Sequence, residues 1–266
     1  MNGQRCFRTL DLPAKHIVNP EPKLWMEATP TKLIPVYNPQ SDTSSPWWFS
    51  TIPSEPEYVF SKSVVSGEDP GLVEDDGSCR QVVEFPGGQG FEIMHQLYRP
   101  NIEDYLELWV VFDGNIVEGE ADAFILDSGH FPSNGLGFLY YNKSSVAAYA
   151  PNQLAVADRP AAATSGLNVW RVQWKNSSYI AISFNNELLV NKTVNVSLTV
   201  NYTTLPGDLF PLRLGMNSQL QDRSLQGRIA ELQLFDRELT DYEANVTNLG
   251  FMTKYAVNGT KGGDCP

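Results

Sequence analysis

The sequence has little positive charge and no long apolar segment. Its 266 residues include 19 Lys+Arg against 31 Asp+Glu, a formal net charge of −12. An acidic surface repels phosphate backbones, so we expect no nucleic-acid partner. Apolar runs such as residues 108–112 are far shorter than the roughly 20 residues of a membrane-spanning helix, so we expect no membrane insertion. The first residues lack the apolar stretch of a signal peptide. We therefore expect either a leader removed earlier or a chain that does not use the secretory route.

Catalytic patterns are equally sparse. The spacing of the three histidines, His16, His95 and His130, fits neither a metal site nor a nucleophilic catalytic group. No Gly-x-Ser-x-Gly motif supports a hydrolase triad. Glu118, Glu120 and Asp122 would share one face of a strand, as do the paired carboxylates of retaining glycosidases. Gly119 instead favours a solvated acidic loop. The sequence thus indicates a non-enzyme, with a glycoside hydrolase as the weaker alternative.

Only three cysteines are present, Cys6, Cys79 and Cys265. An odd count allows at most one internal disulfide, and the spacing fits no zinc site. If a bridge forms, we favour Cys79–Cys265, because it would tie the C-terminal tail to the domain.

The first 56 residues differ in composition from the rest of the chain. They hold half of its 18 prolines: Pro13, Pro20, Pro22, Pro30, Pro35, Pro39, Pro46, Pro53 and Pro56. Proline excludes a helix or a central strand here, yet large apolar residues such as Trp25 and Trp48 are rare in disordered linkers. We predict an extended arm over residues 1–56. It either packs on its own domain or docks on a neighbouring subunit.

Beyond the arm, short strands alternate with turns. Strands are predicted at residues 107–112, 169–174, 179–184, 209–214 and 228–235. In the strand at 169–174, one face should carry Trp170, Val172 and Trp174. In the strand at 209–214, Arg213 should point outward. The inward residues of the last strand should be Ala230, Leu232 and Leu234. Regular strand spacing without helical patterns predicts an all-β fold, a two-sheet antiparallel β-sandwich over residues 57–254 with a tail at 255–266.

One short helix is also predicted. Thr240 and Glu243 form a capping box, and the helix should run to about Asn248 and stop at Gly250.

Four segments in order resemble laminin-G-like and concanavalin A-like domains. They are residues 83–93, 104–110, 168–189 and 212–243, the last containing the Gly-Arg-Ile-Ala-Glu-Leu-Gln-Leu-Phe stretch. The chain departs from the pattern where Asn186-Glu187 replaces Asn-Gly. The resemblance implies a jelly-roll sandwich that binds glycans or proteins at loops on one rim, often with calcium.

The resemblance also implies a place for that calcium ion. It would lie between loops that offer Asp127 and Ser128 on one side and Asn217 and Asp222 on the other. An ordinary turn at residues 127–129 is the alternative.

Sugar binding requires exposed aromatic rings beside polar groups. Tyr140, Tyr141 and Tyr149 are the candidates, although one of the adjacent pair Tyr140 and Tyr141 would face the core.

The chain also carries a run of glycosylation sequons. They are Asn142, Asn176, Asn191, Asn195, Asn201, Asn245 and Asn258. In a secreted eukaryotic protein these would carry glycans, whereas in another setting they are only polar turns and strands.

Two functions remain open at this stage. The leading hypothesis is a non-catalytic adhesion module at an extracellular surface, whose partner is a glycan or a surface glycoprotein. The alternative is a structural or decoration protein of a virus particle, oligomeric and attached through residues 1–56. That alternative expects a chain without residues 1–56 to be a folded monomer that no longer assembles.

Overall fold

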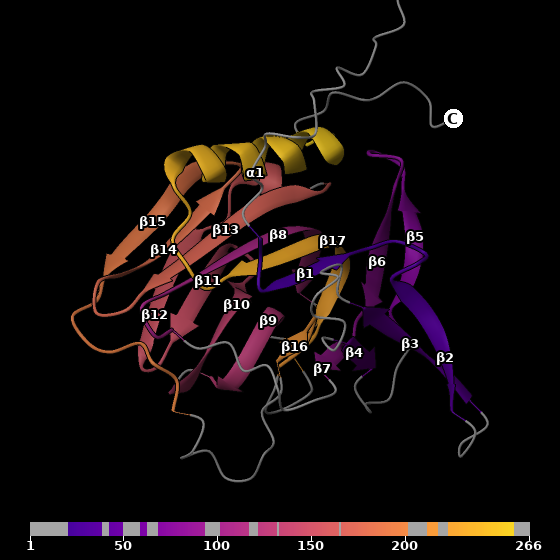
Figure 1. Ribbon diagram of the computed structural model, residues 1–266, viewed down its shortest axis with the longest axis horizontal. Helices are drawn as coiled ribbons and strands as arrows, with labels where there is room; N and C mark the ends of the chain where they lie inside the picture. Colours follow the sequence, from indigo (N-terminus) through magenta and orange to yellow (C-terminus); the bar gives the residue numbers. More distant parts are fainter. Residues whose placement is uncertain are drawn as a thin grey trace, which may run out of the picture.

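A computed structural model of the chain shows a β-sandwich of two antiparallel sheets with one α-helix near the C-terminus (Figure 1). The structure describes residues 21–38, 43–49, 59–62, 69–93, 102–116, 122–131, 133–164, 166–201, 212–217 and 223–257. The predicted fold class is confirmed. No helix in this part of the chain is long and apolar enough to cross a membrane.

Sheet A carries the helix on its outer face. Its strands, in spatial order, are β15 (Glu187–Thr193), β14 (Tyr179–Phe184), β13 (Asn168–Lys175), β8 (Tyr105–Ile116), β17 (Leu225–Phe235), β6 (Arg80–Pro86) and β5 (Gly71–Asp75), with β1 (Leu24–Glu27) paired to β17. The partners of β17 are β8 along its length, β6 at residues 226–229 and β1 at residues 231–234. The N-terminal strand therefore lies directly beside the last strand of the chain.

Sheet B forms the other layer. Its order is β12 (Gln153–Asp158), β11 (Ser145–Ala150), β10 (Asn134–Asn142), β9 (Ala123–His130), β16 (Arg213–Leu214), β7 (Phe91–Ile93), β4 (Val59–Lys62), β3 (Thr43–Phe49) and β2 (Leu33–Asn38). A short 3-10 helix, η1 (Ala161–Thr164), precedes β13.

Aromatic side chains fill the space between the sheets. Trp170, Val172 and Trp174 of β13 are buried there together, as their alternation predicted. The Trp170 ring lies 5.8 Å from that of Phe112 in sheet A and 5.6 Å from that of Phe138 in sheet B. Burying such rings is the main source of stability in a sandwich core.

The described part of the N-terminal stretch belongs to this sandwich. Leu24, Met26 and Trp48 are fully buried in the core, and β2 and β3 extend sheet B. Pro35 of the edge strand β2 pairs with Pro46 of β3, at positions that need no backbone N–H from either residue. The predicted boundary at residue 56 is therefore wrong, because three strands of the sandwich precede it.

Two inward–outward assignments also need correction. A β-bulge between Ile229 and Glu231 makes Ala230 an extra residue, so Ile229 joins the core between the sheets and Ala230 packs on the outer side. Arg213, expected outside, is only 5% exposed. Its guanidinium donates to Glu92 Oε2 at 2.8 and 3.1 Å, which compensates its burial.

The hairpin between β14 and β15 explains the departure from the Asn-Gly pattern. Asn185 and Asn186 both have positive φ, 47° and 72°, as a two-residue type I′ turn requires. Asparagine tolerates this conformation better than most residues, so Asn185 and Asn186 can form the turn without glycine, and Glu187, at the position expected to be glycine, begins β15.

The helix α1 (Asp241–Lys254) begins as predicted but ends later. Thr240 Oγ1 accepts from the Glu243 N–H, and Glu243 Oε2 accepts from the Thr240 N–H at 2.9 Å. Gly250 does not stop the helix, because the next turn is anchored on sheet A: Phe251 packs on Trp109 with ring centroids 6.2 Å apart.

Candidate functional site

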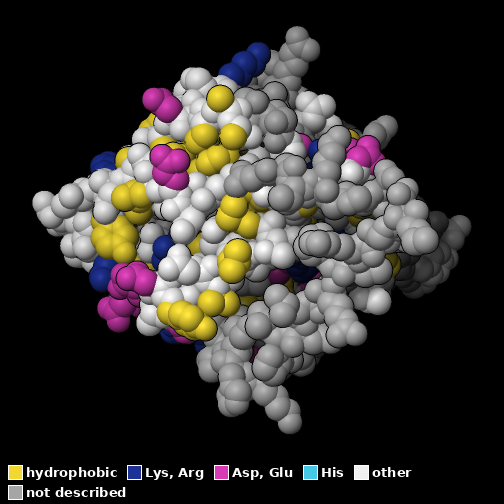
Figure 2. Space-filling view, turned by 90° about the horizontal axis from the view of Figure 1, so that it is seen from above, with side chains coloured by type: hydrophobic (Ala, Val, Ile, Leu, Met, Phe, Trp, Pro, Cys, Tyr) yellow, Lys and Arg dark blue, Asp and Glu magenta, His cyan; other side chains and the backbone are white. Residues whose placement is uncertain are grey.

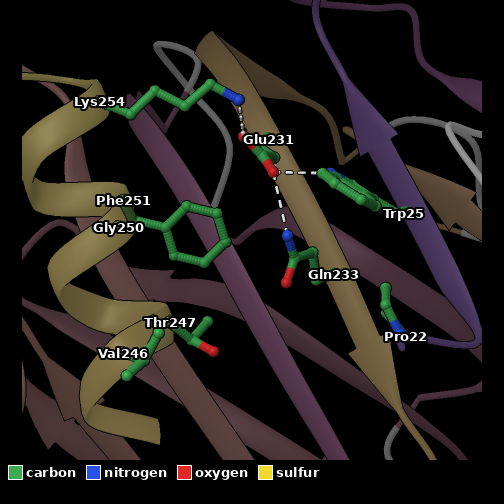
Figure 3. A pocket seen from close by; sticks show the side chains of 9 residues that line it. All are labelled: Pro22, Trp25, Glu231, Gln233, Val246, Thr247, Gly250, Phe251 and Lys254. Atoms are coloured by element: carbon green, nitrogen blue, oxygen red, sulfur yellow. Dashed lines mark hydrogen bonds and ion pairs between the residues drawn. The ribbon is translucent and has the colours of Figure 1, made fainter. Parts of the chain in front are cut away.

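A pocket of about 200 Å³ lies on the outer face of sheet A, between β1 and the C-terminal half of α1 (Figure 3). Strand β17 forms its floor, β1 one wall and α1 the other. Its lining consists of Pro22, Trp25, Glu231, Gln233, Val246, Thr247, Gly250, Phe251 and Lys254.

A buried carboxylate holds the three elements together. Glu231, whose side chain is 2% exposed, accepts from Trp25 Nε1 at 2.6 Å and Gln233 Nε2 at 3.0 Å through Oε1. Its Oε2 accepts from Lys254 Nζ and from the Tyr255 hydroxyl at 2.7 Å. Four donors occupy the lone pairs of Glu231, so this residue organises the pocket and has no capacity left for a ligand.

Lys254 bridges the helix to β1 as well as to β17. Its Nζ donates to Glu27 Oε1 at 2.7 Å in addition to Glu231. Tyr255 beside it is buried, and burial, followed by the negative charge of Glu231, raises the pKa of its phenol above the ordinary 10.0. Tyr255 is therefore a neutral donor to the carboxylate at physiological pH.

The helix wall is apolar and open at one position. Val246 and Phe251 present hydrocarbon to the pocket, and Gly250 lies between them. A Cβ built on Gly250 meets no atom within 4 Å. The missing side chain thus contributes to the free volume.

This arrangement suits a small ligand with one apolar face and several hydroxyls. The half-buried Trp25 ring can stack on such a face, while the Gln233 amide oxygen and the Thr247 hydroxyl can hydrogen-bond its polar edge. A monosaccharide residue has this combination of surfaces.

Sequence reasoning did not find this site. Trp25 was recognised only as an aromatic residue of the arm, and Gly250 only as a helix end. The signal available was a tryptophan two residues before a glutamate, Trp25-Met-Glu27, within a proline-rich stretch. The pairing of Trp25 with Gln233 is visible only in three dimensions.

The tyrosines predicted to bind sugar lie elsewhere. Tyr140, 1% exposed, is the member of the Tyr140–Tyr141 pair that faces the core, whereas Tyr149, expected to be exposed, is 0% exposed. Tyr140 faces the core against Phe112, and Tyr149 packs on Phe131 on the outer side of sheet B. Tyr141 is 37% exposed, so its role stays a prediction.

The expected calcium ligands are only partly placed. Asp127 and Asn217 are buried, Asp222 lies outside the described residues, and Ser128 is buried in β9. Arg213 pairs in register with Asp127 and donates to the Asn217 carbonyl at 3.2 Å. No group of three or more His, Cys, Asp or Glu that could hold a metal ion occurs among the described residues, and the calcium site stays a prediction.

The acidic motif and the histidines give no described catalytic group. Glu118 and Glu120 lie outside the described residues, as do His16 and His95; only the backbone of His130, in β9, is described. Asp122 forms an ion pair with Arg223 at 2.7 Å. Burial raises its pKa, and the charge of Arg223 opposes that rise.

Cys79 is disulfide-bonded. Both other cysteines lie outside the described residues, so the expected partner Cys265 stays a prediction.

The sequons differ in accessibility. Exposed asparagines among them are Asn142, Asn191, Asn195, Asn201 and Asn245, and Asn258 lies outside the described residues. Asn176 is half-buried, and its side chain bonds to Glu103, Leu198 and Thr199.

On the face that carries α1, hydrophobic and acidic side chains occur in separate small groups (Figure 2). Tyr242 and Leu249 are the most exposed large apolar residues of α1, at 68% and 65%. Scattered exposed side chains of this kind are ordinary on a soluble surface, so they do not by themselves mark an interface.

No family model and no curated protein matches the chain. Solved structures do match in fold. The binding domain of botulinum neurotoxin serotype G has a TM-score of 0.55 and 9% identity, over 88% of this chain and 51% of that chain. The serotype D ligand-binding domain, in complex with N-acetylneuraminic acid, has a TM-score of 0.53 and 9% identity, over 86% and 50%. The Trypanosoma rangeli sialidase, in complex with 2,3-difluoro-KDN, has a TM-score of 0.52 and 11% identity, over 86% and 32%.

These matches span about half of the toxin chains and about a third of the sialidase chain. At such low identities the likeness shows the fold, a lectin-like β-sandwich, and not the function. The resemblance to laminin-G domains in particular stays a prediction.

Proposed function

We propose that this protein is a non-catalytic glycan-binding module whose ligand enters the pocket between β1 and α1. The observation that carries the proposal is one pocket lined by the Trp25 ring on β1, the Gln233 amide on β17 and the Thr247 hydroxyl on α1. Sugar sites combine an aromatic platform with a few fixed polar groups in this way.

Two further observations support the proposal. The fold is shared with domains solved with sugar ligands, including N-acetylneuraminic acid. The disulfide at Cys79 is typical of an oxidising compartment, such as the extracellular space, where surface glycans are met. The alternative of a particle protein attached through residues 1–56 gains nothing from the structure, because β1 to β3 pair within the chain's own sheets.

The test is binding of the full chain to an immobilised panel of surface glycans. Trp25→Ala removes the platform and should abolish binding, whereas Trp25→Phe keeps a ring and should retain part of it. Tyr141→Ala is the matched control, since Tyr141 is an exposed aromatic residue on the other sheet.

A panel with no bound glycan contradicts the proposed function. Binding lost in Tyr141→Ala but kept in Trp25→Ala would move the site to the tyrosine that the sequence indicated. Circular dichroism on each variant distinguishes lost binding from lost folding.

A further inference from the structure

We infer that the pocket is selective for neutral sugars and discriminates against sugars that carry a carboxylate. This inference rests on the proposed function and names the class of ligand. It runs against expectation from the fold alone, because a domain of similar fold was solved with the acidic sugar N-acetylneuraminic acid.

The charged side chains beside the pocket disfavour an anionic ligand. Glu27 and Glu231 are both ion-paired to Lys254, which contributes the single positive charge of the lining. This ion-paired group of two carboxylates and one ammonium carries a net charge of −1, with Arg80 as a further positive charge acting on the neighbouring Tyr255. The Lys254 ammonium donates to both Glu27 and Glu231, which uses two of its three N–H groups. The carboxylate of a ligand could accept only from the third N–H group and would be repelled by the two glutamates.

The direction of α1 also disfavours an anionic ligand. The pocket is lined by residues 246–254, the C-terminal half of a helix that ends at Lys254. The last carbonyl groups of a helix carry partial negative charge, equivalent to about half an elementary charge at its C-terminus. An anionic ligand here faces the unfavourable end of the dipole.

The polar groups that line the pocket suit hydroxyl groups better than a carboxylate. Recognition of a carboxylate usually employs a guanidinium, which donates two parallel hydrogen bonds, and the lining residues include no arginine. Gln233 and Thr247 are neutral and can both donate to and accept from hydroxyl groups. Figure 3 shows Gln233 on β17, the floor, and Thr247 on α1, both below the Glu231–Lys254 contact.

The experiment compares each neutral glycan of the panel with its sialylated counterpart, lactose with α2,3-sialyllactose among them. Three proteins are used: the full chain, Gly250→Leu, which fills the pocket, and Glu27→Gln, which removes one negative charge beside it. Glu27 does not line the pocket, so this variant changes the charge without changing the lining.

We expect the neutral glycan to bind at least about tenfold more tightly than its sialylated counterpart, a difference of about 1.4 kcal/mol. Gly250→Leu should abolish this binding, and Glu27→Gln should narrow the difference severalfold. Sialylated glycans that bind more tightly than neutral ones, with the same sensitivity to Gly250→Leu, would overturn the inference and leave the proposed function intact. Absence of binding, or binding that Gly250→Leu does not affect, counts against the proposed function at this pocket instead.

Discussion

A substitution at Gly250 separates the stability of α1 from the role of the pocket. Glycine in a helix interior costs roughly 0.5–1 kcal/mol relative to alanine, because it loses more conformational freedom on folding. The added methyl group of Gly250→Ala meets no atom within 4 Å, so no steric term offsets this gain. For a chain of this size we expect the melting temperature to rise by about 1–4 °C.

Gly250→Leu should keep most of that gain while placing three further carbon atoms at the pocket of about 200 Å³. We therefore expect a variant at least as stable as the original chain that no longer binds its glycan. Thr253→Leu is the control, since Thr253 is exposed on the same helix and does not line the pocket.

Thermal unfolding followed by circular dichroism, together with glycan binding on the same samples, checks both parts. A clear fall in melting temperature for Gly250→Ala would refute the reasoning, because the space beside Gly250 would then be filled. Unchanged affinity in Gly250→Leu would show that the pocket is not the binding site.

The remaining predictions concern the buried Glu231, residues 1–56, the helix cap at Glu243 and the sequon at Asn176. Glu231→Gln should lower the free energy of unfolding in urea by about 3 kcal/mol, because it removes the charge from a buried ion pair. A chain without residues 1–56 should give no cooperative unfolding transition, because it loses three strands and the buried Trp48. A folded monomer would instead show that residues 1–56 form an arm independent of the sandwich. Hydrogen bonds from Arg237 and then Thr240 lower the pKa of Glu243 from 4.5 to about 2. The charged Glu243 cap should therefore stabilise α1 fully above about pH 4.5 and lose this effect as the pH falls through about 2. Glu243→Gln should flatten that part of the profile of stability against pH. In protein secreted from eukaryotic cells, glycopeptide mass spectrometry should find Asn176 unmodified, because its amide donates to the Glu103 carbonyl at 2.7 Å, and full occupancy would contradict this.

The sandwich itself could be predicted because its evidence is local. Trp170, Val172 and Trp174 alternate with polar residues, and a strand has a period of two, so their common face follows from the sequence. The capping box at Thr240 and Glu243 is equally local, since both partners lie within one helical turn.

The errors arose where distant segments decide the outcome. Ala230 follows the strand period in the sequence, but a bulge against β8 shifts it to the outer side. Arg213 is a charged residue in a two-residue strand, and only its pairing with β7 brings Glu92 close enough to permit burial. No window of neighbouring residues contains either interaction.

The pocket depends on distant segments in the same way. The donors to Glu231 come from β1, from β17 itself and from the end of α1, so one buried carboxylate fixes the N-terminal strand and the C-terminal helix on opposite sides of the same floor. Satisfying such a group demands polar side chains of defined length at the junction, and these side chains keep the walls from packing against one another. Gly250 then leaves empty the place that a larger residue would fill. Pro22 of the predicted arm and Gly250, the predicted helix end, therefore lie on the two walls of the candidate site.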